Sequence, residues 1–271
     1  MQNSARRSIL CPNCRKLISI DEPLCPYCGL SRPGSWWKTG FLSLFSPYDF
    51  DIIKLLIIVN VVLFILSNIL SFLVPSVNIL RLLGTTGTIP IDVLHRWWTL
   101  VSAGYLHGNI MHIFFNMVAL YQLGPLVLQE FGFYRTVILY VLGGAAGFLI
   151  SYLASVPETL GASASLCALI GALLYYGKSR GGIFGQSLFK QLSGWVIGIG
   201  LFGLLVPGIN NWGHGGGLAG GIVLGFLLGY SEKSRETYFH KLLAAICMLA
   251  TGAILLWALL STFYYLFFAA Q

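Results

Sequence analysis

Seven long apolar stretches follow one another between residue 52 and the end of the chain. They run over Ile52–Val74, Leu106–Leu128, Thr136–Val156, Leu160–Tyr176, Leu192–Val206, Trp212–Tyr230 and Leu242–Ala270. The first, third and last are long enough to cross about 30 Å of hydrocarbon as single helices. The fifth is shorter, and we retain it because flanking residues can extend it. The pattern predicts an all-α polytopic membrane protein with seven transmembrane helices.

The composition excludes a water-soluble globule. Hydrophobic residues make up 56% of the chain and charged residues only 9%, whereas a typical soluble domain is about 25% charged. The formal net charge is +7, but the charges lie in short segments between apolar stretches and not in one basic patch. We therefore expect a lipid bilayer as the surroundings and no nucleic-acid partner.

The positive charges predict the orientation of the helices. If the N-terminus is cytoplasmic, all Lys and Arg residues except Arg81 and Arg96 fall in cytoplasmic segments. An excess of Lys and Arg on the inside is typical of membrane proteins. An odd number of crossings then places the C-terminus outside. We expect a multi-pass integral protein, most simply of the plasma membrane, with an external connection over 75–105.

The first fifty residues are polar and contain two Cys-Pro-x-Cys pairs. The four thiols are Cys11, Cys14, Cys25 and Cys28. Ten residues separate the pairs, a spacing typical of two zinc knuckles around one tetrahedral Zn²⁺. A segment this short has no other means of building a core, so the metal would supply its folding energy. Two disulfides, or four unrelated thiols, are the alternative.

These patterns divide the chain into three parts. We predict a zinc-ribbon head over residues 1–31, a linker over 32–50 and a transmembrane domain over 51–271. The zinc is expected to be structural because four thiolates leave no open coordination position. A cytoplasmic head of this kind also suits a cytosolic partner. Residues 1–50 contain no apolar run typical of a signal peptide, so we expect no cleaved leader.

Glycine recurs at intervals of four in two of the apolar stretches. Gly143 and Gly147 lie in the third stretch, and Gly217, Gly221 and Gly225 lie in the sixth. This spacing places the glycines on one helix face, where a neighbouring backbone can approach closely. The sixth stretch is therefore predicted to pack tightly against another helix. The ordinary enrichment of glycine in membrane helices is the alternative.

Polar side chains gather where three stretches begin on the external side. They are His107, His112 and Asn116 in the second stretch, Ser163 and Ser165 in the fourth, and His214 in the sixth. Polar groups inside a bilayer are costly and tend to be functional. A hydroxyl, a histidine base and additional hydrogen-bond donors are what acyl transfer needs. No Asp or Glu lies at this depth, which favours a Ser-His dyad over a triad.

Only one of the two serines can face His214. Ser163 and Ser165 are about 200° apart around a helix, and the small residues next to Ser163 leave backbone open for a substrate strand, so we select Ser163. His112 and Asn116 are four residues apart, hence on one helix face, and both can donate to an oxyanion. The alternative is structural: the serines bond to a carbonyl one turn earlier, and His112 makes an interhelical hydrogen bond.

Three motifs, in order, resemble the rhomboid family of intramembrane serine proteases. They are HGNIMHIFFN over 107–116, GAS over 161–163 and GHGGGLAGG over 213–221. The resemblance covers about residues 50–270. It implies a rhomboid-like six-helix core, here with one added C-terminal transmembrane helix. It also implies a serine-type endopeptidase that hydrolyses peptide bonds in or near transmembrane segments of membrane proteins, with no cofactor needed for catalysis.

The resemblance assigns a role to each matching position. Ser163 resembles the nucleophile and His214 the base. His112 and Asn116 resemble the side-chain part of the oxyanion hole. The remaining motif positions resemble structural residues of the family, with a loop-organising role for the histidine: His107, Gly161, Gly217 and Gly221.

Three positions depart from the family pattern. Ala164 replaces the usual glycine after the nucleophile, and Cys167 replaces an aromatic residue that commonly stacks on the histidine. A typical Trp-Arg pair reads Trp98-Thr99. These departures leave open a catalytically silent rhomboid-like protein that binds transmembrane helices. A transporter with a histidine proton path is disfavoured because the polar groups cluster near one surface.

Overall fold

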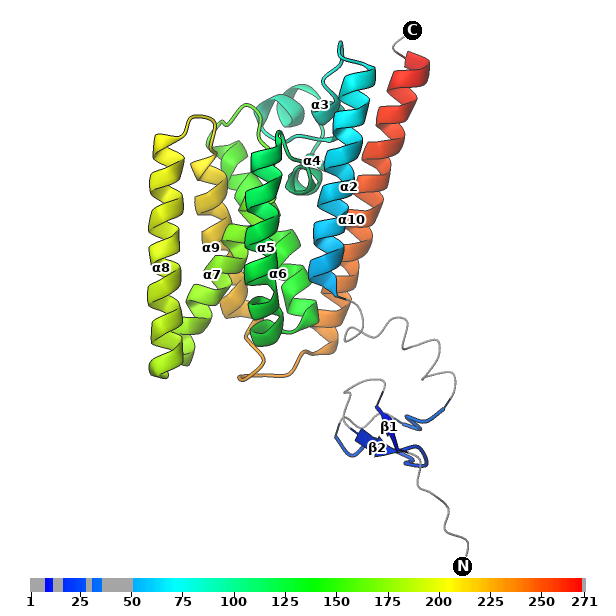
Figure 1. The fold of residues 1–271 in the computed structure, drawn as a ribbon, viewed down its shortest axis with the longest axis vertical. Coiled ribbons are helices and arrows are strands. Elements are labelled where there is room, and N and C mark those ends of the chain that lie inside the picture. The colour runs from blue at the N-terminus through cyan, green and yellow to red at the C-terminus, as the bar shows by residue number, and fades with distance from the viewer. Residues whose placement is uncertain (1–7, 12–16, 28–30, 36–50, 270–271) are drawn as a thin grey trace, which may run out of the picture. The chain divides into compact units, whose positions relative to one another are not determined.

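The structure is a computed structural model that describes residues 8–11, 17–27, 31–35 and 51–269 (Figure 1). The chain separates into two compact units, Met1–Ile52 and Ile53–Gln271. Most of the predicted linker, residues 36–50, lies outside the described residues.

The head unit contains a small antiparallel hairpin. Strand β1 (Ser8–Leu10) pairs with β2 (Leu17–Ser19) in the register Ile9 to Ile18. Cys11 directly follows β1, so the first Cys-x-x-Cys pair begins where the hairpin turns. Among the predicted ligands, Cys14 and Cys28 lie outside the described residues.

A second, shorter pairing encloses the second cysteine pair. Leu24 and Ser31 form an antiparallel bridge on either side of it. Cys25 is buried here, and it forms one cluster with Cys11 and Ile18. The described part of the head therefore brings one cysteine of each pair into the same small core.

The membrane unit is almost entirely helical. Its long helices in the described part are α2 (Ile52–Leu73), α5 (Ile110–Phe131), α6 (Phe133–Leu153), α7 (Ser163–Arg180), α8 (Gly182–Leu205), α9 (Asn211–Leu228) and α10 (Tyr238–Tyr264), the last continued by η3 (Tyr265–Ala269). The connection from α2 to α5 folds into α3 (Ile79–Leu83), η1 (Ile89–Val93), α4 (Thr99–Ser102) and η2 (Ala103–Tyr105). Each predicted apolar stretch thus overlaps one long helix, with ends that differ by several residues.

The starts of α5 and α8 differ from the predicted stretches for local reasons. Helix α5 begins at Ile110, because the Asn109 side chain accepts the N–H of His112 and caps the helix there. His107 therefore lies in the connection before the helix. Helix α8 begins at Gly182, ten residues before the predicted stretch. Its first turns contain polar residues, which a helix tolerates at an exposed end but which lower the hydropathy there.

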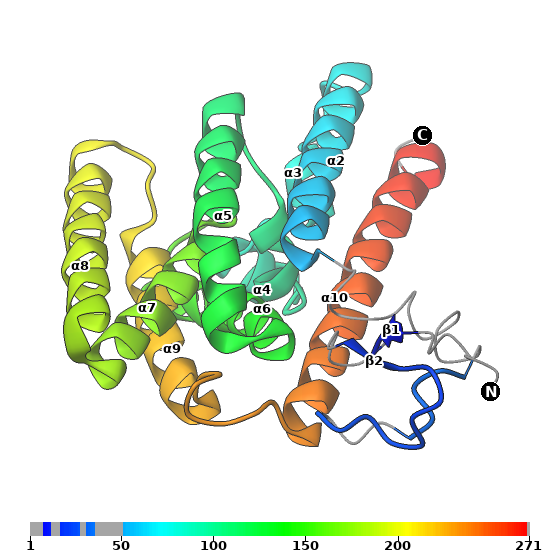
Figure 2. The ribbon, with the colours of Figure 1, turned by 60° about the horizontal axis from the view of Figure 1, so that its bottom comes forward.

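Within the described residues, five helices are long and apolar enough to cross a membrane. They are Ile52–Leu73, Ile110–Phe131, Phe133–Leu153, Gly182–Leu205 and Tyr238–Phe268. Helices α7 and α9, which carry the candidate serine and histidine, do not meet this measure. Most of α7 is buried by protein, and a helix surrounded by other helices need not be uniformly apolar. Helices α8 and α10 lie at opposite ends of the bundle in Figure 1 and Figure 2.

Helices α7 and α9 pack with their backbones in close approach. A Cβ atom on Gly217 would collide with the carbonyl oxygen of Ala164, and one on Gly221 with that of Ala168. The next repeat continues one turn later, where a Cβ atom on Gly225 would lie 3.2 Å from Ala172 Cα. The predicted tight packing of the sixth apolar stretch is confirmed. We call these contacts the α7–α9 seam.

Candidate active site

The α7–α9 seam places the candidate serine and histidine at nearly the same height. The contact points advance by four residues on both helices, so the helices run parallel. Ser163 precedes its first seam residue, Ala164, by one position, and His214 precedes Gly217 by three. At 1.5 Å per residue the two positions differ by about 3 Å along the helix axes.

The two serines of α7 face different neighbours. A Cβ atom on Gly144 of α6 would collide with Ser165 Oγ, so this buried hydroxyl points toward α6. Ser163 lies one turn before Cys167 on the same face of α7. Cys167 in turn lines a pocket together with His214. Ser163 therefore lies on the face that leads to His214, and Ser165 does not.

The backbone before Ser163 is folded to receive an imidazole ring. Gly161 has a φ of +121°, a conformation that favours glycine, and its N–H donates to the carbonyl of Ala103 at 2.9 Å. A Cβ atom on Gly161 would collide with His112 Nε2. His112 thus covers the residue two positions before Ser163. This contact brings the start of α5 to the start of α7.

His107 and Asn116 both contact His112. The rings of His107 and His112 meet edge to face with centroids 5.0 Å apart. The buried His107 Nε2 accepts the N–H of Ala162 at 3.5 Å. Asn116 is also buried and donates from Nδ2 to the His112 carbonyl at 2.9 Å. His107 thus contacts both His112 and the loop before Ser163, and Asn116 contacts His112.

The N-terminal ends of α7 and α9 supply further polar groups. Ala162 occupies the N-cap position of α7 and makes no side-chain cap hydrogen bond. The N–H groups in the first turn of a helix have no intrahelical partners and lie at its positive end. On α9, the N–H of His214 donates to the carbonyl of Asn210 at 3.1 Å. Within the described residues, the buried His214 Nδ1 has no hydrogen-bond partner.

Two pockets adjoin these residues. One has a volume of about 550 Å³ and is lined by polar groups that include His112, Glu158 and Asn210. The other has a volume of about 300 Å³ and lies among α7, α8 and α9, where Cys167 and His214 form part of its mainly apolar wall. Asn211 lines both pockets.

Residues 94–231, just over half of the chain, match the family described as Rhomboid domain. The chain belongs to the rhomboid family. The matched region begins before α4 and ends after α9, so it includes every helix that contributes to the site above.

Rhomboid proteins from a bacterium and a plant are among its relatives. The chain is 33% identical to "Rhomboid protease GluP" of Bacillus subtilis over 57% of this chain and 30% of that protein. It is 34% identical to "RHOMBOID-like protein 6, mitochondrial" of Arabidopsis thaliana over 63% of this chain and 56% of that protein. It is 31% identical to "RHOMBOID-like protein 5" of the same plant over 67% of this chain and 65% of that protein. The chain spans less than two thirds of the length of each of these relatives.

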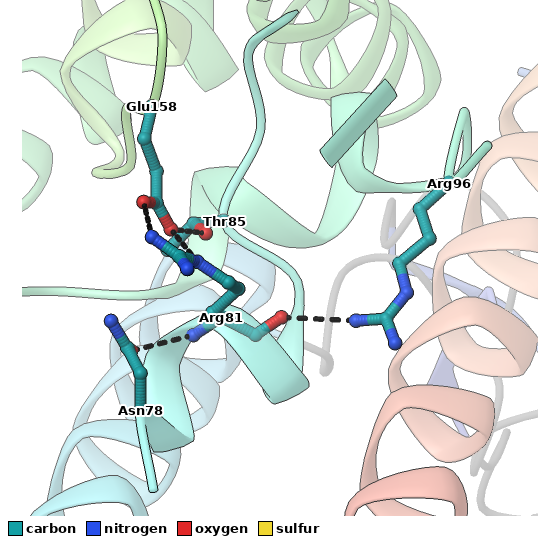
Figure 3. Close-up of polar contacts among 5 residues, drawn as sticks. All are labelled: Asn78, Arg81, Thr85, Arg96 and Glu158. Atoms are coloured by element: carbon teal, nitrogen blue, oxygen red, sulfur yellow. Dashed lines mark hydrogen bonds and ion pairs between the residues drawn. The ribbon is translucent and has the colours of Figure 1, made fainter. Parts of the chain in front are cut away.

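A polar clamp at the rim of the larger pocket was not predicted from the sequence. Glu158, in the α6–α7 loop, accepts from Arg81 Nη2 at 2.6 Å and from Nε at 3.2 Å, and Thr85 Oγ1 donates to the same carboxylate (Figure 3). The hydrogen bond from the Arg81 guanidinium holds the pKa of Glu158 below its usual range. Arg96 donates to the Arg81 carbonyl at 3.3 Å. From the sequence alone, both arginines indicate only that the connection before α5 is external.

No metal site is complete within the described part of the chain, where no three His, Cys, Asp or Glu side chains gather in a way that could hold an ion. Two of the four predicted zinc ligands fall outside those residues. The zinc site of the head stays a prediction.

Proposed function

We propose that this rhomboid-family protein is an intramembrane serine endopeptidase that uses Ser163 as nucleophile and His214 as base. The observation that carries the proposal is the parallel α7–α9 seam, which brings the two residues to one height while His112 covers the loop before Ser163. A hydroxyl and an imidazole from neighbouring helices form the minimum set for nucleophilic acyl transfer. The relative named a rhomboid protease supports the same activity.

The proposed reaction proceeds in two halves. Ser163 Oγ attacks the carbonyl carbon of the scissile peptide bond while His214 takes the hydroxyl proton. The resulting oxyanion is held by donors from His112, Asn116 and the backbone N–H of Ser163. The C–N bond then breaks as His214 returns the proton to the leaving amine. His214 then deprotonates a water molecule that attacks the acyl carbonyl carbon. The ester bond to Ser163 breaks, His214 returns the proton to Ser163 Oγ, and the acid product leaves.

The proposed substrates are membrane proteins cut in or near a transmembrane segment. A helical substrate must unwind locally before its backbone can reach Ser163, so we expect preference for segments with Gly, Pro or other weak helix formers. The apolar pocket beside His214 is proposed to take an apolar side chain near the cut. The polar part of the pocket wall comes from His214 and Asn211, and we expect it to face the backbone of the bound substrate.

Cleavage of one transmembrane substrate by matched variants tests the proposal. Wild type and Ser165→Ala are expected to cleave it, because Ser165 Oγ points toward α6. Ser163→Ala and His214→Ala are expected to lose turnover. Equal turnover in all four proteins would contradict the assignment. Binding of the substrate without cleavage by wild type would support instead a silent rhomboid-like binder of transmembrane helices.

The proposed orientation has the N-terminus in the cytoplasm and the C-terminus outside. It rests on the distribution of Lys and Arg, and the plasma membrane is the simplest location for it. The starts of α5, α7 and α9 would then face the exterior, with water reaching the dyad from that side. Labelling of single cysteines in the 75–105 connection and in the 229–237 loop of intact cells, with a membrane-impermeant maleimide, checks this. Only the first should react.

For the head we propose a structural Zn²⁺ held by Cys11, Cys14, Cys25 and Cys28. The support is the burial of Cys11 and Cys25 in one cluster, each next to a paired backbone segment. The full chain is expected to carry one zinc per molecule, and Cys11→Ser should lose it while Cys167→Ser retains it. A head that keeps its hydrogen-exchange protection after complete removal of zinc would contradict the proposal. A cytosolic partner for the head is part of the same proposal.

A further inference from the structure

Asn210, the residue directly before α9, is bonded to three different elements. Its Oδ1 accepts the N–H of Gly213 at 2.9 Å and so caps α9. Its Nδ2 donates to Thr159 Oγ1 at 3.0 Å, and also to Ser151 Oγ. Ser151 is fully buried in α6, and Thr159 lies in the α6–α7 loop. One side chain therefore joins the start of the histidine-bearing helix to α6 and to the loop that leads into α7.

The α6–α7 loop is also held by backbone hydrogen bonds that do not involve Asn210. Thr159 and Thr86 exchange two backbone hydrogen bonds of 2.7 and 3.0 Å, and Gly161 donates to the Ala103 carbonyl. The Glu158 clamp lies next to them. The loop is thus held in one place by the connection between α2 and α5. Asn210 ties α9 to this same fixed loop.

The α7–α9 seam alone does not fix the histidine. The first α9 residue in the seam is Gly217, which lies nearly one turn after His214. The first turn of a helix has N–H groups without intrahelical partners and needs a cap to stay ordered. In α9 that cap is Asn210, and His214 also donates its N–H to the Asn210 carbonyl.

We propose that Asn210 is a positioning residue for the dyad. By bonding Thr159 and Ser151 while it caps α9, it sets the placement of the His214 imidazole relative to Ser163. The inference rests on the proposed peptidase function and adds to it a residue outside the three motifs. A misplacement of about 1 Å can cost about 100-fold in rate, so loss of this link should act on the chemical step.

Two substitutions remove the link from opposite ends. Asn210→Ser keeps a capping oxygen but is too short to reach Thr159 and Ser151. Thr159→Val removes one partner hydroxyl and leaves the backbone pairing with Thr86 intact. Each should lower kcat, and the rate at which a fluorophosphonate labels Ser163, by about 10-fold or more, with KM changed less than about twofold. Combined, they should cost no more than the stronger single change, as expected for two ends of one interaction.

Two control variants separate positioning from helix capping. Asn210→Asp keeps the size and the capping oxygen and can accept from both hydroxyls, so it should stay within about threefold of wild type. Asn78→Ser makes the same exchange at the cap of α3, where Asn78 Oδ1 accepts the N–H of Arg81 at 3.0 Å, and should leave labelling unchanged.

The outcomes are distinguishable. If Asn210→Ser and Thr159→Val label at the wild-type rate, even with a lower melting temperature, Asn210 is a structural cap and the inference is overturned. If wild type itself neither cleaves nor labels at Ser163, the proposed function fails, and the positioning role with it.

Discussion

Helices α8 and α9 are both rich in glycine, but the glycines in the middle of each helix have opposite surroundings. A Cβ atom on Gly217 or Gly221 of α9 would collide with the backbone of α7. A Cβ atom on Gly194, Gly198 or Gly200 of α8 would meet no atom within 4 Å. The same residue type thus brings two backbones together on α9 and leaves open space on α8.

The contacts of α8 lie toward its two ends. Near its start, a Cβ atom on Gly185 would lie 2.6 Å from the Gly177 carbonyl oxygen of α7. Near its end, one on Gly203 would collide with the Asn211 side chain. The apolar pocket beside His214 lies between these contacts. The fold therefore leaves a pocket between α8 and the candidate dyad, whereas α7 and α9 pack closely against each other.

The largest expected effect comes from filling the seam. Gly221→Ala forces a methyl group onto the Ala168 carbonyl, and overpacking of this kind should lower the free energy of unfolding by about 3 kcal/mol. Gly198→Ala on α8 has room for its methyl and should change stability by less than about 1 kcal/mol. Thermal unfolding of both variants in detergent measures the difference. Equal destabilisation would refute the contrast between the two helices.

A second test concerns the glycine before the serine. Gly161→Ala combines a positive φ with a collision on His112, so we expect about 100-fold lower kcat. Gly182→Ala is the matched control, because Gly182 also has a positive φ of 65° but open space around it. The control should lose stability through backbone strain and retain turnover. Comparable loss of turnover in both would show that strain alone, and not the His112 contact, matters.

A substitution on α8, where the glycines have open space, should have a smaller effect that depends on the substrate. Gly200→Leu should fill the apolar pocket and raise KM about fivefold for a substrate with a bulky apolar side chain near the cut. Substrates with small residues there should be affected less. Gly198→Leu, whose residue does not line the pocket, serves as control. If the two leucine variants behave alike toward both substrates, the pocket does not receive a side chain.

The smallest effect is expected from a change in the Arg81–Glu158 ion pair at the rim of the larger pocket. Arg81 lowers the pKa of Glu158, so the pair stabilises the fold above the ordinary carboxyl pKa and loses its contribution as the pH falls through the lowered value. Glu158→Gln should be less stable than wild type by less than about 1 kcal/mol at neutral pH, and the gap should close in acid. Melting temperatures of both proteins across this pH range measure it. A gap independent of pH would show that the charge of Glu158 is irrelevant.

The sequence predicted the packing of α9 better than the loops around the site. Glycine spacing on one helix is a local pattern, and it identified the seam. The bonds of Asn210 to Ser151 and Thr159 join residues more than fifty positions apart, and those of Arg81 to Glu158 span 77. Such contacts depend on the path of two loops, which no periodic pattern records. The start of α8 was missed for a simpler reason: its first turns carry polar residues, so the apolar stretch begins ten residues after the helix does.

The most direct test of the central claim is the site and rate of fluorophosphonate labelling in the full chain. We expect modification at Ser163 in wild type and in Ser165→Ala, and at least 100-fold slower labelling in His214→Ala, because the hydroxyl loses its base. Modification at Ser165, or labelling of Ser163 at an undiminished rate in His214→Ala, would contradict it.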